Sequence, residues 1–417
     1  MPHTGIMPGM GELLSVAEAL RLIELQADAL PPRRAADLSA TLGLVLAEDV
    51  TSDIDSPPHN KAMMDGYAVR SADGLADRQV VDEVFAGDVP RVGLSPGTAT
   101  KIMTGAPMPA GADAVVPVEK TQSEGDVVRF TGAVPVAGKH VMPRGESIAA
   151  GSVVLKRGSV VRSAEVALLA EVGGVVPPVI PRPRVAVLAT GAELVSADQR
   201  PGPGQIRNSN GPMLLAALAE AGADGVALGA ATDDADALRQ AITAGRDADV
   251  LLLSGGVSAG DRDLAPGVLA DLGVKRVFHK VAVKPGKPLW FGVWERPDES
   301  AGPTYVFGLP GNPVSSFVSF QLFVRPLLAA LSGRGFCGLV EERAVLADEL
   351  SHPGGRETYL PAIFRREKDT PASIRPVAWR GSADLAGLTA ANAFLRLSAD
   401  PAELSVGDPV SALLLPN

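Results

Sequence analysis

Residues 250–263 read VLLLSGGVSAGDRD, and this stretch decides the fold. Its first half is an unbroken apolar run, which is typical of a strand buried on both faces of a parallel sheet. Its second half is a turn rich in glycine and serine. Two further apolar runs end in similar turns, RVAVLATGAEL at 184–194 and TYVFGLPGNPVSS at 304–316. Helical patterns alternate with these runs, so we expect a doubly wound parallel α/β domain over residues 181–335.

The three turns form the first candidate site, because ligands of such sheets bind beyond the carboxyl ends of the strands. Glycine lets a phosphate approach backbone N–H groups, and a helix N-terminus favours the anion. Asn312 and Pro313 suit the N-cap and the first position of a helix that follows the third turn. Ordinary turn chemistry explains any one of these loops, but three together favour a phosphate or nucleotide site. The candidate binding residues are Thr190, Gly191, Ser254, Gly255, Gly256, Ser258, Pro310, Gly311, Asn312 and Pro313. No G-x-G-x-x-G opens a helix after the first strand, so a dinucleotide site is not predicted.

The rest of the chain has a different texture. Short alternating runs with many glycine and proline turns predict a β-rich inserted domain over 51–150 and a C-terminal β-barrel over 340–417. Residues 12–50 and 151–180 make up a further N-terminal domain, with a helix over 13–30 that a capping box of Ser15 and Glu18 would start. Four prolines between 177 and 183 mark its boundary with the α/β domain.

Composition narrows the functional classes. The 417 residues carry a net charge of −10 and no run of Lys or Arg, which disfavours nucleic acid as a partner. Cys337 is the single cysteine, so no internal disulfide and no multi-cysteine metal site is expected. The sequence starts without a basic, apolar leader and has no stretch of 18 uninterrupted apolar residues. We therefore expect a cytoplasmic protein that does not bind membranes.

Charged residues at loop positions suggest an oxyanion and a metal ion. On a continuous strand through FHKVAVKPGKP, Lys280 and Lys284 would share one face, which suits a phosphate or another oxyanion; a solvated edge strand is the alternative. The carboxylates are Asp65, Glu193, Asp233 and Asp263, and such groups can hold Mg²⁺ beside a substrate phosphate. Asp233 would equally suit the first turn of a helix. The histidines have no ligand spacing, and no G-x-S-x-G motif indicates a hydrolase triad.

These motifs, in this order, resemble the molybdopterin molybdenumtransferase family (MoeA and the E domain of gephyrin). The resemblance covers nearly the whole chain. The matching segments are MMDGYAVR (63–70), KIMTGAPMPAGADAVVPVE (101–119), ATGAELV (189–195), GQIRNSNGPML (204–214), ATDDADAL (231–238), LLSGGVSAGDRD (252–263), VKPGKPLWFG (283–292) and FGLPGNPVSSFVSF (307–320).

The resemblance implies an elongated homodimer that inserts molybdate into adenylylated molybdopterin, with release of AMP and help from Mg²⁺. A molybdopterin adenylyltransferase and client molybdoenzymes would be its partners. Six residues would carry the chemistry: Asp65, Glu193, Asp233, Asp263, Lys280 and Lys284. Glu193 and Asp233 would hold the metal, and Thr104, Lys287 and Ser382 would join the strand-end loops in binding.

Two motifs depart from the family pattern. His59, Asn60 and Lys61 replace part of F-D-N-S-A, and Met142 and Ser147 replace an arginine and an aspartate. A further family arginine corresponds to Pro361. These departures indicate a relaxed oxyanion site, a different form of the substrate, or compensation by Lys61 and Arg144. A carrier or scaffold without the chemistry, a paralogue that uses tungstate, and a generic nucleotide-binding protein are the alternatives.

Overall fold

The computed structural model describes residues 13–416 except 233, 258–262, 299 and 301. Contacts divide the chain into two compact units. Unit 1 holds the residues up to 33, residues 43–45 and everything from 179 on, and unit 2 holds 34–42 and 46–178. A three-stranded sheet of order β1-β13-β2 stands where the chain passes from one unit to the other, with the strands β1 (Arg33–Arg34), β2 (Val45–Leu46) and β13 (Pro178–Ile180).

The centre of unit 1 is a six-stranded sheet of order β17-β14-β18-β22-β21-β19. The first four strands run parallel, as predicted. The apolar runs of β14, β18 and β22 are buried, as expected for inner strands, whereas β17 at the edge of the sheet is mostly exposed. The last two pair antiparallel, so the sheet is mixed, a difference from the fully parallel prediction. Its strands are β14 (Arg184–Thr190), β17 (Asp224–Ala231), β18 (Val250–Ser254), β19 (Lys275–His279), β21 (Trp290–Trp294) and β22 (Thr304–Leu309).

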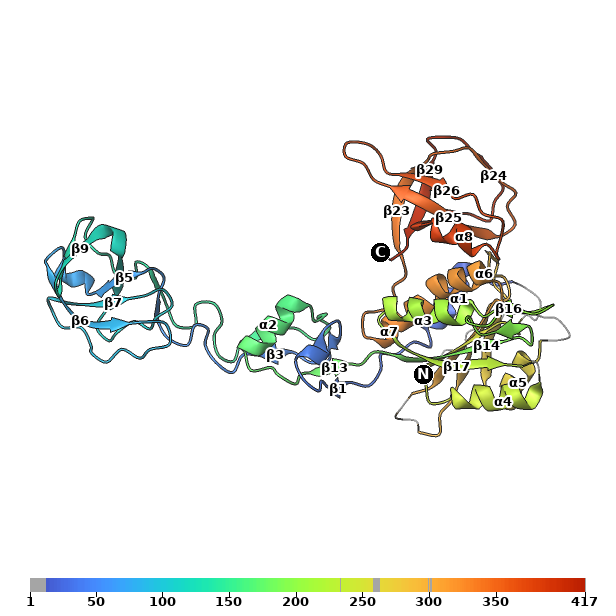
Figure 1. The fold of residues 1–417 in the computed structure, drawn as a ribbon, viewed down its shortest axis with the longest axis horizontal. Coiled ribbons are helices and arrows are strands. Elements are labelled where there is room, and N and C mark those ends of the chain that lie inside the picture. Colours follow the sequence, from blue (N-terminus) through green and yellow to red (C-terminus); the bar gives the residue numbers. More distant parts are fainter. Residues whose placement is uncertain (1–12, 233, 258–262, 299, 301, 417) are drawn as a thin grey trace. The chain divides into compact units, whose positions relative to one another are not determined.

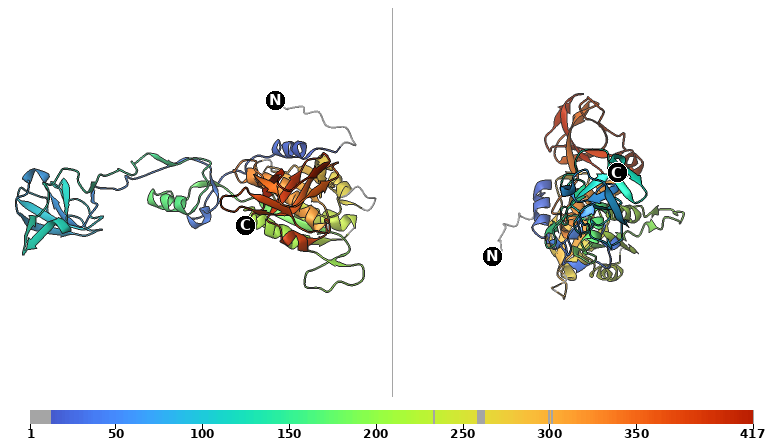
Figure 2. Two further views of the ribbon diagram at one scale, coloured as in Figure 1. Left: turned by 90° about the horizontal axis from the view of Figure 1, so that it is seen from above. Right: turned by 90° about the vertical axis from the view of Figure 1, so that its left-hand side faces the viewer.

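Helices cover both faces of this sheet (Figure 1), as the doubly wound prediction requires. Helices α4 (Ala235–Ala244) and α5 (Ala265–Asp271) lie on one face. Helix α3 (Asn210–Glu220) and the long helix after β22 lie on the other, together with the N-terminal helix α1 (Val16–Glu24), blue in Figure 2. The predicted capping box of α1 is confirmed, since the Glu18 amide donates to Ser15 Oγ and the Ser15 amide to Glu18 Oε2.

The helix after β22 is continuous but not uniform. It consists of α6 (Pro313–Ser319), a π-helical turn η5 (Phe320–Val324) and α7 (Arg325–Leu331). Pro326 cannot donate to the carbonyl of Leu322, which lies within the π turn, and the wider winding accommodates that missing bond. Length and composition alone would let Pro313–Leu331 cross a membrane, but 78% of it is buried inside the protein, as in the core helix of a globular domain.

The C-terminal part of unit 1 is the predicted barrel. Strands β25, β26, β23, β29 and β27 pair in this order, and β27 pairs back with β25 to close the ring. A short strand from the α/β part, β20, pairs in parallel with β25 and joins the two parts. The elements are β20 (Val283–Lys284), β23 (Val340–Leu346), β24 (Leu350–His352), β25 (Glu357–Arg365), β26 (Ser373–Pro376), α8 (Leu385–Thr389), β27 (Ala393–Leu397), β28 (Ala402–Leu404) and β29 (Pro409–Leu414).

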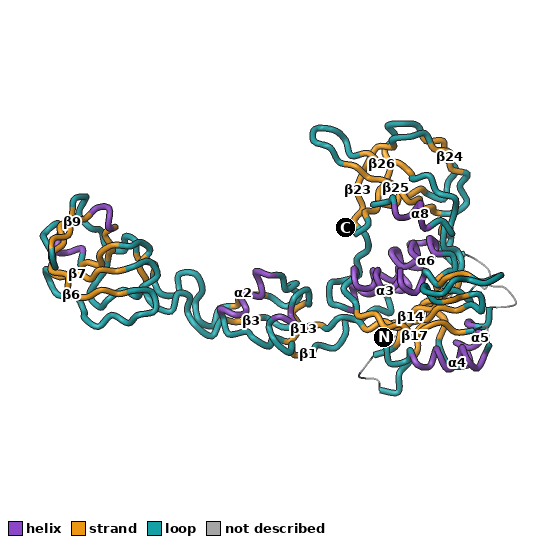
Figure 3. Tube along the Cα trace, in the orientation of Figure 1, coloured by secondary structure: helices purple, strands orange, loops and turns teal. Residues whose placement is uncertain are grey.

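Unit 2 is rich in strands and turns (Figure 3), as predicted for its central region. Its six-stranded sheet has the order β8-β5-β7-β6-β10-β9, and alternate residues of its strands form two small cores on opposite faces. The strands are β5 (Gly66–Val69), β6 (Arg78–Val84), β7 (Thr98–Ile102), β8 (Ala114–Pro117), β9 (Thr121–Glu124) and β10 (Val127–Phe130). Two ribbons, β3 (Val50–Thr51) with β12 (Val153–Leu155) and β4 (Lys61–Ala62) with β11 (Val141–Met142), and the helix α2 (Ser163–Glu171) complete it.

Candidate functional site

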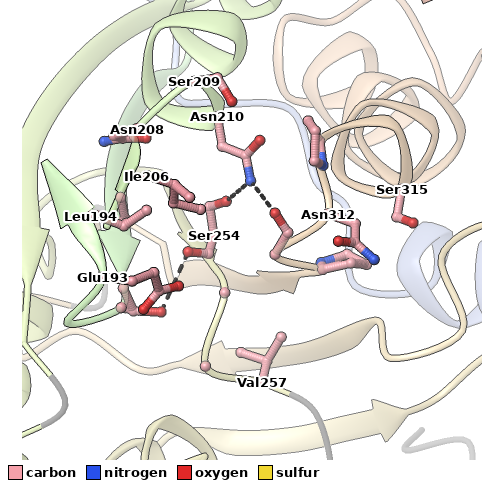
Figure 4. Close-up of a pocket in the computed structure, with 18 of the residues that line it drawn as sticks. Glu193, Leu194, Ile206, Asn208, Ser209, Asn210, Ser254, Val257, Asn312 and Ser315 are labelled. Carbon is pink, nitrogen blue, oxygen red and sulfur yellow. Dashed lines mark hydrogen bonds between the residues drawn. The ribbon is translucent and has the colours of Figure 1, made fainter. Parts of the chain in front are cut away.

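The carboxyl ends of β14, β18 and β22 meet at one edge of the sheet, because these strands are parallel neighbours. A cleft of ≈ 550 Å³ opens there. Figure 4 shows Glu193 on one side of this strand-end cleft and Asn312 and Ser315 on the other. Of the predicted residues, those that line it are Thr190, Gly191, Glu193, Ser254, Gly255, Gly256, Asp263, Pro310, Gly311, Asn312 and Pro313. The structure thus brings together loops that lie far apart in the sequence.

Two glycines after β18 are required by the close approach of the loop after β14. Gly255 has φ +95° and Gly256 has φ +63°, values that favour glycine. A Cβ on Gly255 would lie 2.7 Å from the Thr190 carbonyl oxygen, and one on Gly256 would lie 2.8 Å from Thr190 Oγ1. The turns therefore pack backbone against backbone and leave main-chain groups near the cleft, the arrangement that suits a phosphate.

Asn210, at the start of α3, joins the loops after β18 and β22. Its Nδ2 donates to Ser254 Oγ and to the Gly311 carbonyl oxygen, both at 2.8 Å (Figure 4). The residue is buried, and its Oδ1 has no hydrogen-bond partner within the structure. The prediction from sequence missed Asn210 as a site residue, although it lies inside the GQIRNSNGPML motif.

Carboxylates reach the strand-end cleft from two loops, Glu193 after β14 and Asp263 before α5. The Glu193 carboxylate folds back over Gly191, where a Cβ would lie 2.7 Å from it. Asp233 and Ser258, two further predicted site residues, lie outside the described residues. Asp234 is the N-cap of α4, since its side chain accepts from the amides of Asp236 and Ala237. Across the described part of the chain, no three His, Cys, Asp or Glu residues gather closely enough to hold a metal by themselves.

The prediction of one lysine face on a continuous strand was wrong. Strand β19 ends at His279, and Lys280 has φ +73°, so the chain turns there before β20 begins at Val283. The alternation breaks because β20 leaves the central sheet to pair with β25 of the barrel. Lys284 and Lys287 instead line a second cleft of ≈ 540 Å³, whereas Lys280 stands at the break.

This second cleft is lined by three cationic side chains and two hydroxyl groups: Lys284, Lys287, Arg356, Ser315 and Ser382. Ser315 and Pro288 also line the strand-end cleft, so the two clefts adjoin. Arg356 donates through Nη1 to the Val283 carbonyl oxygen at 3.0 Å, which holds it beside the lysine loop. Sequence reasoning missed Arg356, since only the turn at Gly354-Gly355 marks its position in the chain.

Asn312 occupies the N-cap position of α6 with Pro313 behind it, as predicted, but its side chain makes no capping bond. Its Nδ2 donates to Ser382 Oγ at 2.9 Å, and the Val314 amide donates to the Ser382 carbonyl oxygen at 3.0 Å. The segment that carries Ser382 is fixed in turn by Asp384. Hydrogen bonds from the Gly387 and Arg380 amides hold Asp384 and lower the pKa of its carboxyl.

His279 ties the end of β19 to the turn after β18. Its Nε2 lies 3.0 Å from the Val257 carbonyl oxygen, so this nitrogen carries the proton. Burial lowers the pKa of the imidazole, and the bond to Val257 opposes that shift. The ring is therefore a neutral donor near pH 7.

The remaining predicted residues, Asp65 and Thr104, lie in unit 2. Asp65 Oδ1 accepts hydrogen bonds from the Thr104 amide and from Thr104 Oγ1, both at 2.7 Å. These bonds lower the pKa of the Asp65 carboxyl, with the backbone bond the larger cause. Asp65 is exposed, so an ionised carboxylate with one free oxygen faces outward from this unit.

The departures in two motifs lie near one ribbon of unit 2, whereas Pro361 lies in β25 of the barrel. Met142 in β11 pairs with Lys61 in β4. Arg144 donates through Nε to Asp55 Oδ2 at 2.5 Å, and its amide donates to Asn60 Oδ1 at 2.8 Å. Arg144 is thus already engaged within unit 2. Its proposed role as a replacement for the arginine at 142 stays a prediction.

Comparison with known proteins agrees with this architecture. Three family models match: "MoeA N-terminal region (domain I and II)" over residues 14–173, "Probable molybdopterin binding domain" over 186–330 and "MoeA C-terminal region (domain IV)" over 343–415. Molybdopterin molybdenumtransferase 2 of Mycobacterium tuberculosis is 39% identical over 390 residues, which cover 89% of this chain and 92% of the relative. The molybdopterin molybdenumtransferase of a Nostoc species is 37% identical and covers 91% and 88%. The crystal structure of a molybdopterin biosynthesis MoeA protein from Pyrococcus horikoshii superposes with a TM-score of 0.80 at 31% identity, over 97% of this chain and 99% of the other.

Proposed function

The chain belongs to the molybdopterin molybdenumtransferase family, and we propose that its strand-end cleft holds the adenylylated pterin substrate while the adjoining cation-lined cleft receives molybdate. The protein is a transferase of molybdenum cofactor biosynthesis that inserts molybdate into adenylylated molybdopterin and releases AMP. The observation that carries the site assignment is the adjacency of the two clefts, which share Pro288 and Ser315.

Charge and hydrogen-bond donors explain why molybdate is assigned to one cleft and the nucleotide to the other. Both substrates are anions, so their approach needs fixed positive charge and hydrogen-bond donors. Lys284, Lys287 and Arg356 supply the charge, and the hydroxyl groups of Ser315 and Ser382 supply donors at the same wall. The glycine turns after β14 and β18 and the N-terminus of α3 suit the phosphate groups of the nucleotide. Molybdate is thereby held next to the pterin that accepts it.

The carboxylates of the strand-end cleft fit Mg²⁺. This ion uses one or two carboxylates and takes its other ligands from phosphate and water, so a cluster of three protein ligands is not required. Glu193 and Asp263 are the described carboxylates at this cleft. Bound there, Mg²⁺ would offset charge on the phosphoanhydride that is cleaved when AMP leaves. Asp65 in unit 2, ionised and held by Thr104, is proposed as a further catalytic group.

We test the assignment by measuring AMP release from adenylylated molybdopterin and Mg²⁺ on addition of molybdate. Asp263→Ala and Asp65→Asn are expected to bind the pterin nucleotide but to lose molybdate-dependent release. Arg129→Ala is the matched control, because Arg129 forms an exposed pair with Asp77 in unit 2. Unimpaired turnover in both acidic variants would refute the site assignment. Binding without release in the wild-type protein would instead indicate a carrier, and release with tungstate alone a specialised paralogue.

We also propose that the chain acts as a homodimer in the cytoplasm, which is what the family resemblance implies. An adenylyltransferase would supply its substrate, and molybdoenzymes would take up the product. Light scattering on the purified chain tests the first point, with an expected mass twice the 42.8 kDa of one chain.

A further inference from the structure

We infer that Asn312 is a positioning residue that sets the direction of the Ser382 hydroxyl, so that this hydroxyl donates its proton to the bound oxyanion. The inference rests on the proposed function of the cation-lined cleft. It assigns a specific role to a residue that the sequence marks only in general terms, as one of the binding residues of the strand-end turns.

The Asn312 side chain does not cap the helix at whose N-terminus it lies. Asn at an N-cap normally accepts a hydrogen bond from an amide in the first turn of the helix. Here the cap position is occupied, but the side chain makes no such bond. The amide instead reaches across to the barrel and donates through Nδ2 to Ser382 Oγ at 2.9 Å. A residue that gives up its usual local bond for one 70 positions away in the chain indicates a role outside the helix.

The direction of the hydrogen bond from Asn312 determines where the Ser382 hydroxyl proton points. A serine hydroxyl has one proton to donate and two lone pairs that accept. Because Asn312 Nδ2 is a donor, Ser382 Oγ must act as the acceptor of this bond, and its own proton points away from Asn312. The Ser382 backbone is fixed separately, since its carbonyl oxygen accepts from the Val314 amide at 3.0 Å. The backbone bond positions the residue, and the amide of Asn312 sets the rotation of its hydroxyl.

The Ser382 hydroxyl proton can point into the cation-lined cleft. Ser382 lines the same cleft as Lys284, Lys287 and Arg356, and all three are donors without acceptor capacity. All oxygens of an oxyanion in this cleft accept hydrogen bonds, so every polar side chain around it should donate one. The two lysines and the arginine always donate, but Ser382 does so only if its hydroxyl proton points into the cleft. Asn312 meets that condition, whereas a side chain that accepts from Ser382 would turn the proton away.

The decisive variant is Asn312→Asp, which keeps the shape but replaces the donating NH₂ with an acceptor. Aspartate is a good N-cap and suits the positive end of a helix, so the thermal midpoint is expected to hold or rise. The Ser382 proton would then turn toward the carboxylate introduced at position 312. The KM for molybdate in AMP release is expected to rise about tenfold, the cost of one hydrogen bond to a charged group. Asn312 also lines the strand-end cleft, so the affinity for the pterin nucleotide is measured alongside, and it is expected to fall less than the affinity for molybdate.

Added negative charge at 312 would also weaken molybdate binding, and a double-mutant cycle separates the two effects. Ser382→Ala alone is expected to raise the KM about tenfold, and Asn312→Asp in the Ser382→Ala background is expected to add less than about twofold. Equal losses from Asn312→Asp with and without Ser382 would show repulsion acting directly and would overturn the inference. A wild-type KM for Asn312→Asp beside an impaired Ser382→Ala would also overturn it, because the bond would then run the other way.

Calorimetric titration of each full-length protein with sodium molybdate gives a readout that does not depend on turnover. If wild-type protein binds molybdate, Asn312→Asp weakens that binding only when Ser382 is present, and no AMP is released, the positioning role stands and the proposed function fails. If AMP is released normally and the two variants bind molybdate like wild type, the proposed function stands and the positioning role fails.

Discussion

Asn210 shows how one side chain can determine the geometry of the whole strand-end cleft. Its amide spans the loops after β18 and β22, and it is buried at the start of α3. Both partners of the amide would remain in place after its removal, so a truncation leaves the Gly311 carbonyl oxygen unpaired. The residue therefore contributes to stability and to the shape of the nucleotide site at once.

Asn210→Ala is expected to lower the free energy of unfolding by about 1–3 kcal/mol, the cost of leaving buried polar groups unpaired. Urea denaturation measures the change. Gln205→Ala is the control, since Gln205 only accepts a bond from the Gly202 amide in an exposed turn, and it is expected to cost less than about 0.5 kcal/mol. Equal losses in both variants would contradict the bracing role.

The stability of unit 2 is expected to depend on pH through Asp65, because two hydrogen bonds from Thr104 lower the pKa of its carboxyl below the ordinary 3.8. A carboxyl whose pKa is lowered by folding stabilises the fold at any pH above its ordinary, unfolded-state pKa. This stabilisation is lost as the pH falls through the lower pKa of the folded state. Thr104→Val removes the hydroxyl donor and is expected to raise the pKa of Asp65 toward 3.8. The deficit in thermal midpoint should then be largest near neutral pH and shrink below about pH 4. Thr121→Val, which removes only a bond to the Val118 carbonyl oxygen, should show a deficit that does not vary with pH.

Among the secondary-structure elements, the loop between β20 and β21 is the one whose shape matters most for the oxyanion. Gly286 has φ +122°, and a Cβ there would lie 2.8 Å from Ser319 Oγ on the buried face of α6. Ser319 cannot retreat, because it is fully enclosed. Close contact with α6 therefore fixes the course of the loop, and this course places Lys284 and Lys287 at the cleft.

Gly286→Ala is expected to displace this loop and to raise the KM for molybdate at least about tenfold, with a smaller effect on nucleotide binding. Gly273→Ala is the matched control. Its φ of +83° is also positive, but no atom lies within 4 Å of the added Cβ. Both variants should lose stability, and only Gly286→Ala should lose affinity for molybdate. A raised KM in both would assign the effect to strain alone.

The elements also show where sequence patterns stop being informative. The buried run of β18 and the glycines that end it could be predicted, because both are local consequences of a two-sided sheet and of a close contact. Lys280 could not be placed, because the break after His279 is caused by pairing of β20 with a strand more than 70 residues later. Asn312 was predicted at its cap, but its partner Ser382 lies in the barrel, and Arg356 enters the cleft for the same non-local reason.

For the whole molecule, the separation into two units has a thermodynamic consequence. Each unit has its own cores, so we expect two transitions in calorimetric unfolding. AMP and molybdate should raise the midpoint of the transition of unit 1 alone. Each ligand should add about 2.7 kcal/mol to the free energy of unfolding of unit 1 when it is present at a hundred times its Kd. A single transition that shifts as a whole would contradict this.

The N-terminal segment belongs to unit 1 even though unit 2 follows it directly in the chain. The Leu14 carbonyl oxygen accepts from the Ala282 amide, and the Leu30 amide donates to the Leu331 carbonyl oxygen. On the ribosome, these partners emerge long after helix α1 does, whereas unit 2 is complete once residue 178 has left the tunnel. Unit 2 can therefore fold during translation while helix α1 waits. Helix α1 is made before unit 2 but is buried after it, and until then it is open to proteases and chaperones.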